Sequence, residues 1–228
     1  TNNLPAKESG AMAGMYKARN VDLTVKPGGP GVDVVKLVAV GQFKFGMAVS
    51  DQIALARNQD IPVVGIMSPF QKYPQILMVH EESGIKTFED MSTKGTRIAV
   101  STTAVFAQFL RRKYNWKEEQ LLRYNGQLAE WLNDKDRATQ GLITNEPFVA
   151  KNAGAKPVPL LIGEQSGYNP YQKMLFTTEE VIQKEPDLVS AVVAASIEGW
   201  RAYIESGAKT NEYLKTKNQD LTPEGMAF

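Results

Sequence analysis

RIAVSTTAVFAQFLRRKYNWKEEQLLRY, residues 97–124, contains the signals of a strand, a helix and a second strand in succession. Residues 97–100 and 120–124 are the candidate strands. The helix between them is expected to run to about residue 114. Thr102 or Thr103 is its expected N-cap, because a threonine oxygen accepts a hydrogen bond from the first turn. This order is typical of parallel strands joined by a crossover helix, so the stretch predicts an α/β protein with helices flanking mostly parallel sheets.

The same alternation continues along most of the chain. Residues 61–67, IPVVGIM, form a short apolar run that is typical of a strand covered on both faces. A helix is expected shortly before them, with Ser50 or Asp51 as its N-cap. In full, we expect strands at residues 21–26, 43–49, 61–67, 76–80, 97–100, 120–124, 139–143, 158–162 and 173–177, and helices at residues 32–40, 51–58, 88–91, 102–114, 128–132, 147–152, 178–184, 186–206 and 211–217.

Two segments, residues 72–82 and 168–177, are candidate crossovers between two lobes. Two crossings divide the chain into a discontinuous first lobe, made from both ends of the sequence, and a continuous second lobe. We place lobe 1 at residues 1–78 and 174–228 and lobe 2 at residues 79–173. The Gly- and Pro-rich region at 154–170 is expected to be a loop.

The composition limits the classes of function. Of the 228 residues, 43% are hydrophobic and 22% are charged, as in ordinary soluble domains, and the formal net charge is +1. Nucleic acid needs a concentrated basic surface, which the sequence lacks, so it is not an expected partner. No run of 18 apolar residues predicts a membrane span. Cysteine is absent, which excludes disulfides, thiolate metal sites and cysteine nucleophiles.

Small polar and aromatic residues follow the predicted strands. Ligands of open α/β sheets bind beyond the carboxyl ends of the strands, so these residues are candidates for a ligand site. Two facing rims of this kind suit a small polar or aromatic molecule. The candidates are Ser50, Asp51, Ser68, Phe70, Thr102, Thr103, Asn125 and Glu146, together with Tyr168 in the loop expected between the lobes.

Glu146 has two interpretations. It lies in LITNEPFVAKNAG, residues 142–154, where an apolar strand gives way to a helix. Asn145 is a good N-cap, and an acid in the first turn stabilises the helix dipole, so the residue is explained by the helix alone. The other interpretation is a ligand contact. The STTA turn at 101–104 has the same ambiguity, because it suits either ordinary capping or an anion on backbone N–H groups.

Signals for catalysis are poor. The single histidine, His80, stands at the end of a predicted strand, and no nucleophile motif accompanies it. No carboxylates have the spacing of metal ligands, and PGGPG at 27–31 lacks the Lys-Ser/Thr ending of a phosphate-binding loop. We therefore expect no catalytic residue, no metal and no cofactor.

Several longer motifs resemble one family. VDLTVKPGGPGVD (21–33) is followed by LVAVGQFKFGMAVSDQIALARNQDIPVVGI (37–66), SPFQKYPQILMVH (68–80), GTRIAVS (95–101), GLITNEPF (141–148) and SIEGWRAYI (196–204). Together they resemble the NMT1/THI5-like family of ABC-transporter substrate-binding proteins over nearly the whole chain. The resemblance implies the type II periplasmic-binding-protein fold, with two α/β lobes, two hinge strands and a ligand cleft between the lobes.

The resemblance also implies a function. Members of the family are similar to binders of thiamine-pyrimidine precursors, and relatives in the wider group bind riboflavin, alkanesulfonates, taurine or nitrate. Glu146 matches the "(S/N)-E-P" turn of the family, which faces the cleft. A carboxylate there suits a nitrogen-containing aromatic ligand with N–H donors and repels a sulfonate or nitrate. Binding is expected to favour closure of the lobes.

The expected partners are a small-molecule ligand and an ABC permease with a cytoplasmic ATPase, and the protein is expected to be a monomer. It is expected outside the cytoplasmic membrane, in a periplasm or on a lipid anchor, after removal of a signal peptide. A binding module without a transporter is a further possibility that the sequence leaves open. The same family includes a fungal thiamine-pyrimidine synthase with a cysteine-rich motif. The absence of cysteine argues against that enzymatic alternative.

Overall fold

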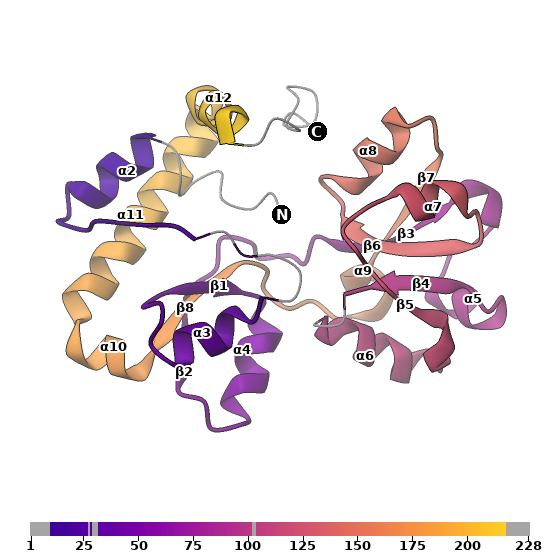
Figure 1. Ribbon diagram of the computed structural model, residues 1–228, viewed down its shortest axis with the longest axis horizontal. Coiled ribbons are helices and arrows are strands. Elements are labelled where there is room, and N and C mark those ends of the chain that lie inside the picture. The colour runs from indigo at the N-terminus through magenta and orange to yellow at the C-terminus, as the bar shows by residue number, and fades with distance from the viewer. Residues whose placement is uncertain (1–9, 27, 29–31, 102–103, 218–228) are drawn as a thin grey trace. The chain divides into compact units, whose positions relative to one another are not determined.

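The computed structural model describes residues 10–26, 28, 32–101 and 104–217, and the chain forms two compact units (Figure 1). Unit 1 comprises the described residues within Thr1–Phe70 and Lys173–Ala227, and unit 2 comprises Gln71–Gln172. The chain thus changes unit after residues 70 and 172, where the sequence suggested 78 and 173. The first boundary differs because the strand β3, Gln75–His80, pairs with strands of unit 2 on both of its sides.

Unit 1 contains a three-stranded sheet in the order β1-β8-β2. Its strands are β1 (Gly46–Ala48), β2 (Val63–Met67) and β8 (Met174–Thr178). β8 lies between β1 and β2, the two strands from the first part of the chain, and runs antiparallel to both.

The helices of unit 1 pack on the two faces of this sheet. Successive residues of a strand point to opposite faces, and Leu175 and Phe176 of β8 accordingly belong to separate hydrophobic clusters. In the Leu175 cluster, the Tyr16 hydroxyl donates a hydrogen bond of 2.8 Å to Ser196. The helices are α2 (Gly10–Lys17), α3 (Val34–Ala39), α4 (Ser50–Arg57), α10 (Glu179–Lys184), α11 (Pro186–Glu205) and α12 (Ala208–Lys217).

Unit 2 contains a five-stranded mixed sheet in the order β5-β4-β6-β3-β7. β4 pairs in parallel with both β5 and β6, whereas β3 is antiparallel to both β6 and β7. All six residues of β3 are buried, which fits its place inside the sheet, between β6 and β7. The other strands are β4 (Arg97–Val100), β5 (Leu121–Arg123), β6 (Arg137–Leu142) and β7 (Pro157–Leu161).

Two aromatic groups anchor the helices of unit 2. Trp131 is 1% exposed and its indole N–H donates to the carbonyl of Met78 on β3, at 3.1 Å. Phe88 packs edge-to-face on Tyr114 and on Trp116. The helices are α5 (Phe88–Thr93), α6 (Val105–Lys113), α7 (Ala129–Asn133), α8 (Glu146–Asn152) and α9 (Ile162–Ser166), with short 3-10 helices at Glu81–Ser83 and Glu118–Gln120.

The predicted α/β architecture is confirmed. Mostly parallel sheets were expected, but the unit 2 sheet is mixed and the described strand pairs of the unit 1 sheet are all antiparallel. The prediction of a strand at residues 21–26 is wrong. Burial does alternate there, with Val21 buried and Asp22 exposed, but the described residues provide no partner strand. The region 154–170, expected to be a loop, contains β7 and α9. No helix in the described part of the chain is long and apolar enough to cross a membrane.

His80, the last residue of β3, is fully buried against Trp131. The two rings stack with centroids 3.6 Å apart, and His80 Nε2 donates to the Trp131 carbonyl at 2.7 Å. Lys135 Nζ lies 3.3 Å from Nδ1 and donates to it, so both nitrogens are engaged as in a neutral imidazole. Burial lowers the pKa of His80, and the positive charge of Lys135 lowers it as well. The hydrogen bond to the Trp131 carbonyl and the charges of Glu82 and Asp134 raise it, but the net shift is downward.

We expect this histidine to make the protein less stable in mild acid. The folded state takes up the proton less readily than the unfolded chain, so the stabilisation is complete above about pH 6.5 and is lost as the pH falls below it. The melting temperature should fall between pH 7.5 and 5.5, and His80→Phe, which keeps a stacked ring without a titratable group, should flatten that fall. Parallel curves for the two proteins would contradict the assignment.

Candidate functional site

The candidate site lies at one edge of the sheet in unit 2. From β4 the chain crosses to β5 on one side, and from β5 it crosses back over β4 to β6 on the other side. The carboxyl ends of the neighbouring strands β4 and β6 are therefore a topological switch point, where ligands of open α/β sheets bind. Ser101, Tyr124 and Glu146 follow the three parallel strands at this edge.

Glu146, the first residue of α8, points its carboxylate back at the end of β6. Its Oε2 accepts the backbone N–H of Leu142 at 2.6 Å, and the helix begins without a side-chain cap from Asn145. Asn145 thus takes the predicted N-cap position, but its side chain makes no capping hydrogen bond. One carboxylate oxygen holds the strand-to-helix turn in place. Glu146 as a whole residue is half-buried.

Gly141 makes room for this arrangement. A Cβ at position 141 would lie 2.8 Å from Cβ and Cγ of Glu146, closer than side-chain atoms approach each other. Glycine therefore allows the glutamate to lie against β6. Gly141 was not among the predicted site residues, although a glycine inside a strand often marks a place where another part of the chain approaches closely.

Tyr124 supplies the second contact of the carboxylate. Its hydroxyl donates to Glu146 Oε1 at 3.4 Å, which is long for an O–H···O hydrogen bond. Burial and, after it, the Glu146 charge raise the pKa of Tyr124, so the phenol is protonated at neutral pH. Among the described residues this is the one hydrogen-bond partner of Oε1. The oxygen keeps most of its accepting capacity for another donor.

Aromatic side chains lie at the same edge, beside the amino end of β3. Tyr168, a predicted site residue, packs on Phe109 with ring centroids 4.7 Å apart and on Tyr73 at 6.1 Å. Tyr73 is tied to the loop of Tyr168 by its backbone N–H, which donates to Asn169 at 2.9 Å. The next residue, Pro74, accepts the N–H of Ile143 at the end of β6. Through Pro74 and Ile143, the segment that carries Tyr73 is hydrogen-bonded to the turn that carries Glu146.

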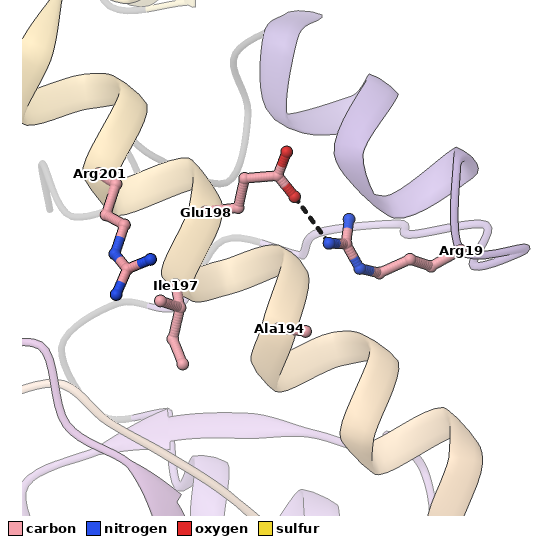
Figure 2. Close-up of a pocket in the computed structure, with 5 residues that line it drawn as sticks. All are labelled: Arg19, Ala194, Ile197, Glu198 and Arg201. Atoms are coloured by element: carbon pink, nitrogen blue, oxygen red, sulfur yellow. Dashed lines mark ion pairs between the residues drawn. The ribbon is translucent and has the colours of Figure 1, made fainter.

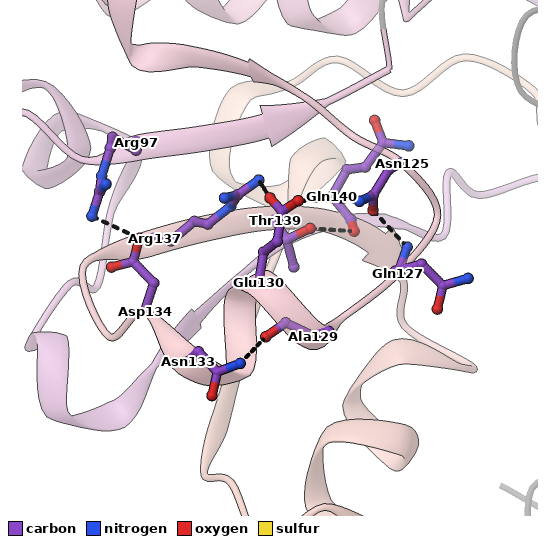
Figure 3. Close-up of polar contacts among 10 residues, drawn as sticks. All are labelled: Arg97, Asn125, Gln127, Ala129, Glu130, Asn133, Asp134, Arg137, Thr139 and Gln140. Atoms are coloured by element: carbon purple, nitrogen blue, oxygen red, sulfur yellow. Dashed lines mark hydrogen bonds and ion pairs between the residues drawn. The ribbon is translucent and has the colours of Figure 1, made fainter.

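The side chain of Asn125 forms hydrogen bonds within and next to its own loop. Its side-chain oxygen accepts the N–H of Gln127 at 2.9 Å, and its amide donates to Glu130 at 3.2 Å (Figure 3). Glu130 in turn pairs with Arg137 at the start of β6, at 2.5 Å. The structure therefore gives Asn125 a local role in holding the β5–α7 loop. Thr102 and Thr103, also predicted, lie outside the described residues.

Four predicted residues lie in unit 1, after the carboxyl ends of β1 and β2. Ser50 and Asp51 are the first two residues of α4, and neither is its N-cap, because Val49 takes that position and its N–H is accepted by Gln52. The Ser68 hydroxyl donates to the Phe70 carbonyl at 3.1 Å. Phe70 is 38% exposed and packs edge-to-face on Trp200.

Lys173 was not predicted and lies at the same edge of unit 1. It directly precedes β8, whose first residue pairs with Ala48 at the end of β1. Its backbone is left-handed, with φ of 58°, and burial lowers the pKa of its ammonium group. No feature of the local sequence distinguishes this lysine from the many others in the chain.

Two surface hollows of unit 1 lie elsewhere. One, of about 540 Å³, is lined by Arg19, Ala194, Ile197, Glu198 and Arg201, with Arg19 and Glu198 paired at 2.8 Å (Figure 2). The other, of about 400 Å³, is lined by Lys17, Asn20, Val21 and Asp22. Neither contains a predicted site residue. In the described ranges no three His, Asp or Glu residues are grouped to hold a metal.

Two solved structures with a similar fold are sulfonate-binding proteins by name. The periplasmic aliphatic sulphonate binding protein SsuA from Escherichia coli matches with a TM-score of 0.73 and 15% identity, over 99% of this chain and 73% of that chain. The alkanesulfonate-binding protein SsuA from Xanthomonas axonopodis pv. citri, bound to MOPS, matches with a TM-score of 0.69 and 14% identity, over 99% and 79%. The chain therefore has the periplasmic-binding-protein fold, as predicted.

The family follows from the sequence. The model of the NMT1/THI5-like family matches residues 10–209, and the chain belongs to this family. The predicted family is thereby confirmed. No curated protein matches the chain.

We expect Gly141→Ala to destabilise the protein by about 1–3 kcal/mol, the usual effect of overpacking, because Glu146 must move away from β6. Urea unfolding measures the change. Gly14→Ala in α2 is the control, since its Cβ would meet no atom within 4 Å and alanine in a helix is favourable by roughly 0.5–1 kcal/mol. Equal stability of Gly141→Ala and the wild type would contradict the close approach.

Proposed function

We propose that the protein is the extracytoplasmic substrate-binding protein of an ABC importer and that its ligand is a small nitrogen-containing aromatic, such as a thiamine-pyrimidine precursor. Membership of the NMT1/THI5-like family and the periplasmic-binding-protein fold support the transport role. The partners of this role are a permease and a cytoplasmic ATPase, and the role needs no covalent chemistry.

The observation that carries the choice of ligand is the geometry of Glu146. One carboxylate oxygen is fixed by the Leu142 N–H, and the other has only the long contact to Tyr124 among the described residues. An amino group on a heterocycle can donate to that second oxygen in a charge-assisted hydrogen bond. The Tyr168 and Phe109 rings at the same edge offer a surface for the flat face of such a ligand.

A sulfonate ligand is the second candidate, because two of the similar structures are sulfonate-binding proteins by name. At about 15% identity this likeness speaks for the fold alone. The Glu146 carboxylate favours the heterocycle, since it repels an anion and offers acceptors where a sulfonate needs donors.

A thermal-shift screen of the full-length protein tests the proposal. The panel contains aminopyrimidines, thiamine, flavins, taurine, ethanesulfonate and nitrate. A ligand at about 100 times its Kd stabilises the folded state by about 2.7 kcal/mol, which is a clear rise in melting temperature. A rise with an aminopyrimidine supports the proposal. A rise with ethanesulfonate or taurine alone selects the sulfonate candidate, and no rise with any compound contradicts both.

Glu146→Gln should weaken the binding of an aminopyrimidine by roughly 1.5–3 kcal/mol, because the amide keeps the shape of the carboxylate and removes its charge. Titration calorimetry measures the change. Glu164→Gln is the matched control, since Glu164 is also an acid in the first turn of a short helix of unit 2 and is exposed. Unchanged affinity in Glu146→Gln would leave Glu146 with its structural contact to Leu142 alone.

A further inference from the structure

The aromatic surface of the candidate site is formed by two elements that are far apart in the sequence. Phe109 lies on α6 and Tyr168 follows α9, and their ring centroids are 4.7 Å apart with an interplanar angle of 34°. Phe109 is 37% exposed and Tyr168 is half-buried, so both rings keep accessible surface. A flat ligand contacts both rings well only while their relative position is held. The contacts that join α6 to the loop of Tyr168 are therefore important for binding.

Lys113, at the carboxyl end of α6, is joined to the end of α9. It stands one helical turn after Phe109, and its ammonium group donates to the carbonyl of Ser166 at 2.7 Å. Tyr114, the next residue, donates its hydroxyl to the Gln165 carbonyl at 2.9 Å. The last carbonyls of a helix lack partners within the helix, so these two donors satisfy acceptors that the backbone leaves open. The bond from Lys113 is charge-assisted and is therefore of the stronger kind.

Ser166 in turn holds the backbone of Tyr168. It is buried, and its hydroxyl accepts the N–H of Tyr168 at 3.2 Å and donates to the Ile162 carbonyl at 2.6 Å. Gly167 between them ends the helix in the left-handed conformation, with φ of 74°. The carbonyl that Lys113 holds thus belongs to the residue that fixes the Tyr168 backbone.

The ammonium group of Lys113 also lies close to the rings of Phe109 and Tyr114. Its Nζ is 6.0 Å from the centroid of the Phe109 ring and 5.6 Å from that of the Tyr114 ring, within the range of cation–π contacts. Lys113 is exposed, whereas Tyr114 is buried and packs on Phe88. The lysine can therefore be changed without opening the core.

We propose that Lys113 is a positioning residue of the ligand site, whose ammonium group holds the loop of Tyr168 so that the Tyr168 and Phe109 rings form one surface for a flat aromatic ligand. This inference rests on the proposed function and deepens it, because a prearranged pair of rings favours planar rings over non-aromatic ligands with the same N–H donors. Loss of the ammonium group releases the loop and leaves both rings and Glu146 in the chain.

The test compares Lys113→Met, which keeps an unbranched side chain without a donor, with Lys113→Arg, which keeps the charge and the donors. Titration calorimetry measures the affinity for 4-aminopyrimidine and for acetamidine, which has N–H donors but no ring. Lys113→Met should bind 4-aminopyrimidine about threefold to tenfold more weakly, the scale of one aromatic contact, and should not lose affinity for acetamidine. Lys113→Arg should restore the affinity. Lys94→Met is the matched control, since Lys94 of unit 2 is also exposed and donates to a backbone carbonyl, that of Ser83, at 2.7 Å.

Amide hydrogen exchange of Tyr168 in the ligand-free protein tests the positioning itself. Exchange should be at least about tenfold faster in Lys113→Met, the effect of losing one charge-assisted hydrogen bond, and close to the wild-type rate in Lys113→Arg. Unchanged exchange in Lys113→Met would overturn the inference, and so would an equal loss of affinity for both ligands. Lys113→Ala replaces Lys113→Met if the latter does not fold.

Failure of the proposed function is a separate result. A wild type that binds no aminopyrimidine would contradict that function, whereas faster Tyr168 exchange in Lys113→Met would still support the positioning role of Lys113. Equal affinity of the wild type and Lys113→Met for 4-aminopyrimidine would leave the function in place and overturn the inference.

Discussion

In unit 1, the sheet depends on hydrogen bonds to a single strand, because β1 and β2 each pair with β8 and are separated by it. β8 also connects the two hydrophobic clusters, since Leu175 faces one and Phe176 faces the other. Its Thr177 hydroxyl further donates to the carbonyl of Lys44, at 2.6 Å. β3 has the equivalent place in unit 2, fully buried between β6 and β7. Each sheet thus contains one strand that runs antiparallel to both of its neighbours.

The candidate site is a consequence of how the remaining strands are connected. The parallel strands β4, β5 and β6 end at one edge, and the chain crosses from β4 to one side and then back to β6 on the other, which makes the carboxyl ends of β4 and β6 a switch point. Several polar groups at this edge form hydrogen bonds within the protein. Glu146 satisfies the end of β6, Gln140 satisfies the start of the next turn, and Tyr124 rests against the Glu146 carboxylate. The second oxygen of Glu146 and the aromatic surface of Tyr168 and Phe109 are the features on which we base the proposal of a nitrogen-containing ring as the ligand.

The sequence predicted elements well where a local pattern decides them. Residues 97–100 form a strand with the expected bounds, because an apolar run beside a helix start has few alternatives. The strand predicted at residues 21–26 fails because strand pairing depends on a distant partner, which alternation of burial does not provide. α9 was missed because its five residues, IGEQS, carry no helical periodicity. The antiparallel pairs of β3 and β8 were not predicted, because the direction of a strand relative to its neighbours depends on contacts between residues far apart in the sequence.

Site residues divide in a similar way. Glu146 was predicted because an acid after a buried strand is unusual, and Tyr168 because it stands in a loop expected between the lobes. Gln140 and Tyr124 were not predicted as candidates, because both are ordinary strand-end residues until the fold places them beside Ser101 and Glu146. Ser50 and Asp51 show the reverse error, since they suit a helix cap by type and the helix begins one residue earlier.

The central place of β8 has a consequence for the order of folding. Unit 2 is continuous in sequence, so all its strands are available once residue 172 has left the ribosome. The unit 1 sheet must wait for β8, whose Met174 pairs with Ala48 across the whole of unit 2. Closing so long a segment is entropically costly and slow, and the cost is smaller when the intervening chain is already compact. Unit 2 is accordingly expected to fold first and to bring the two ends of unit 1 together as it does so.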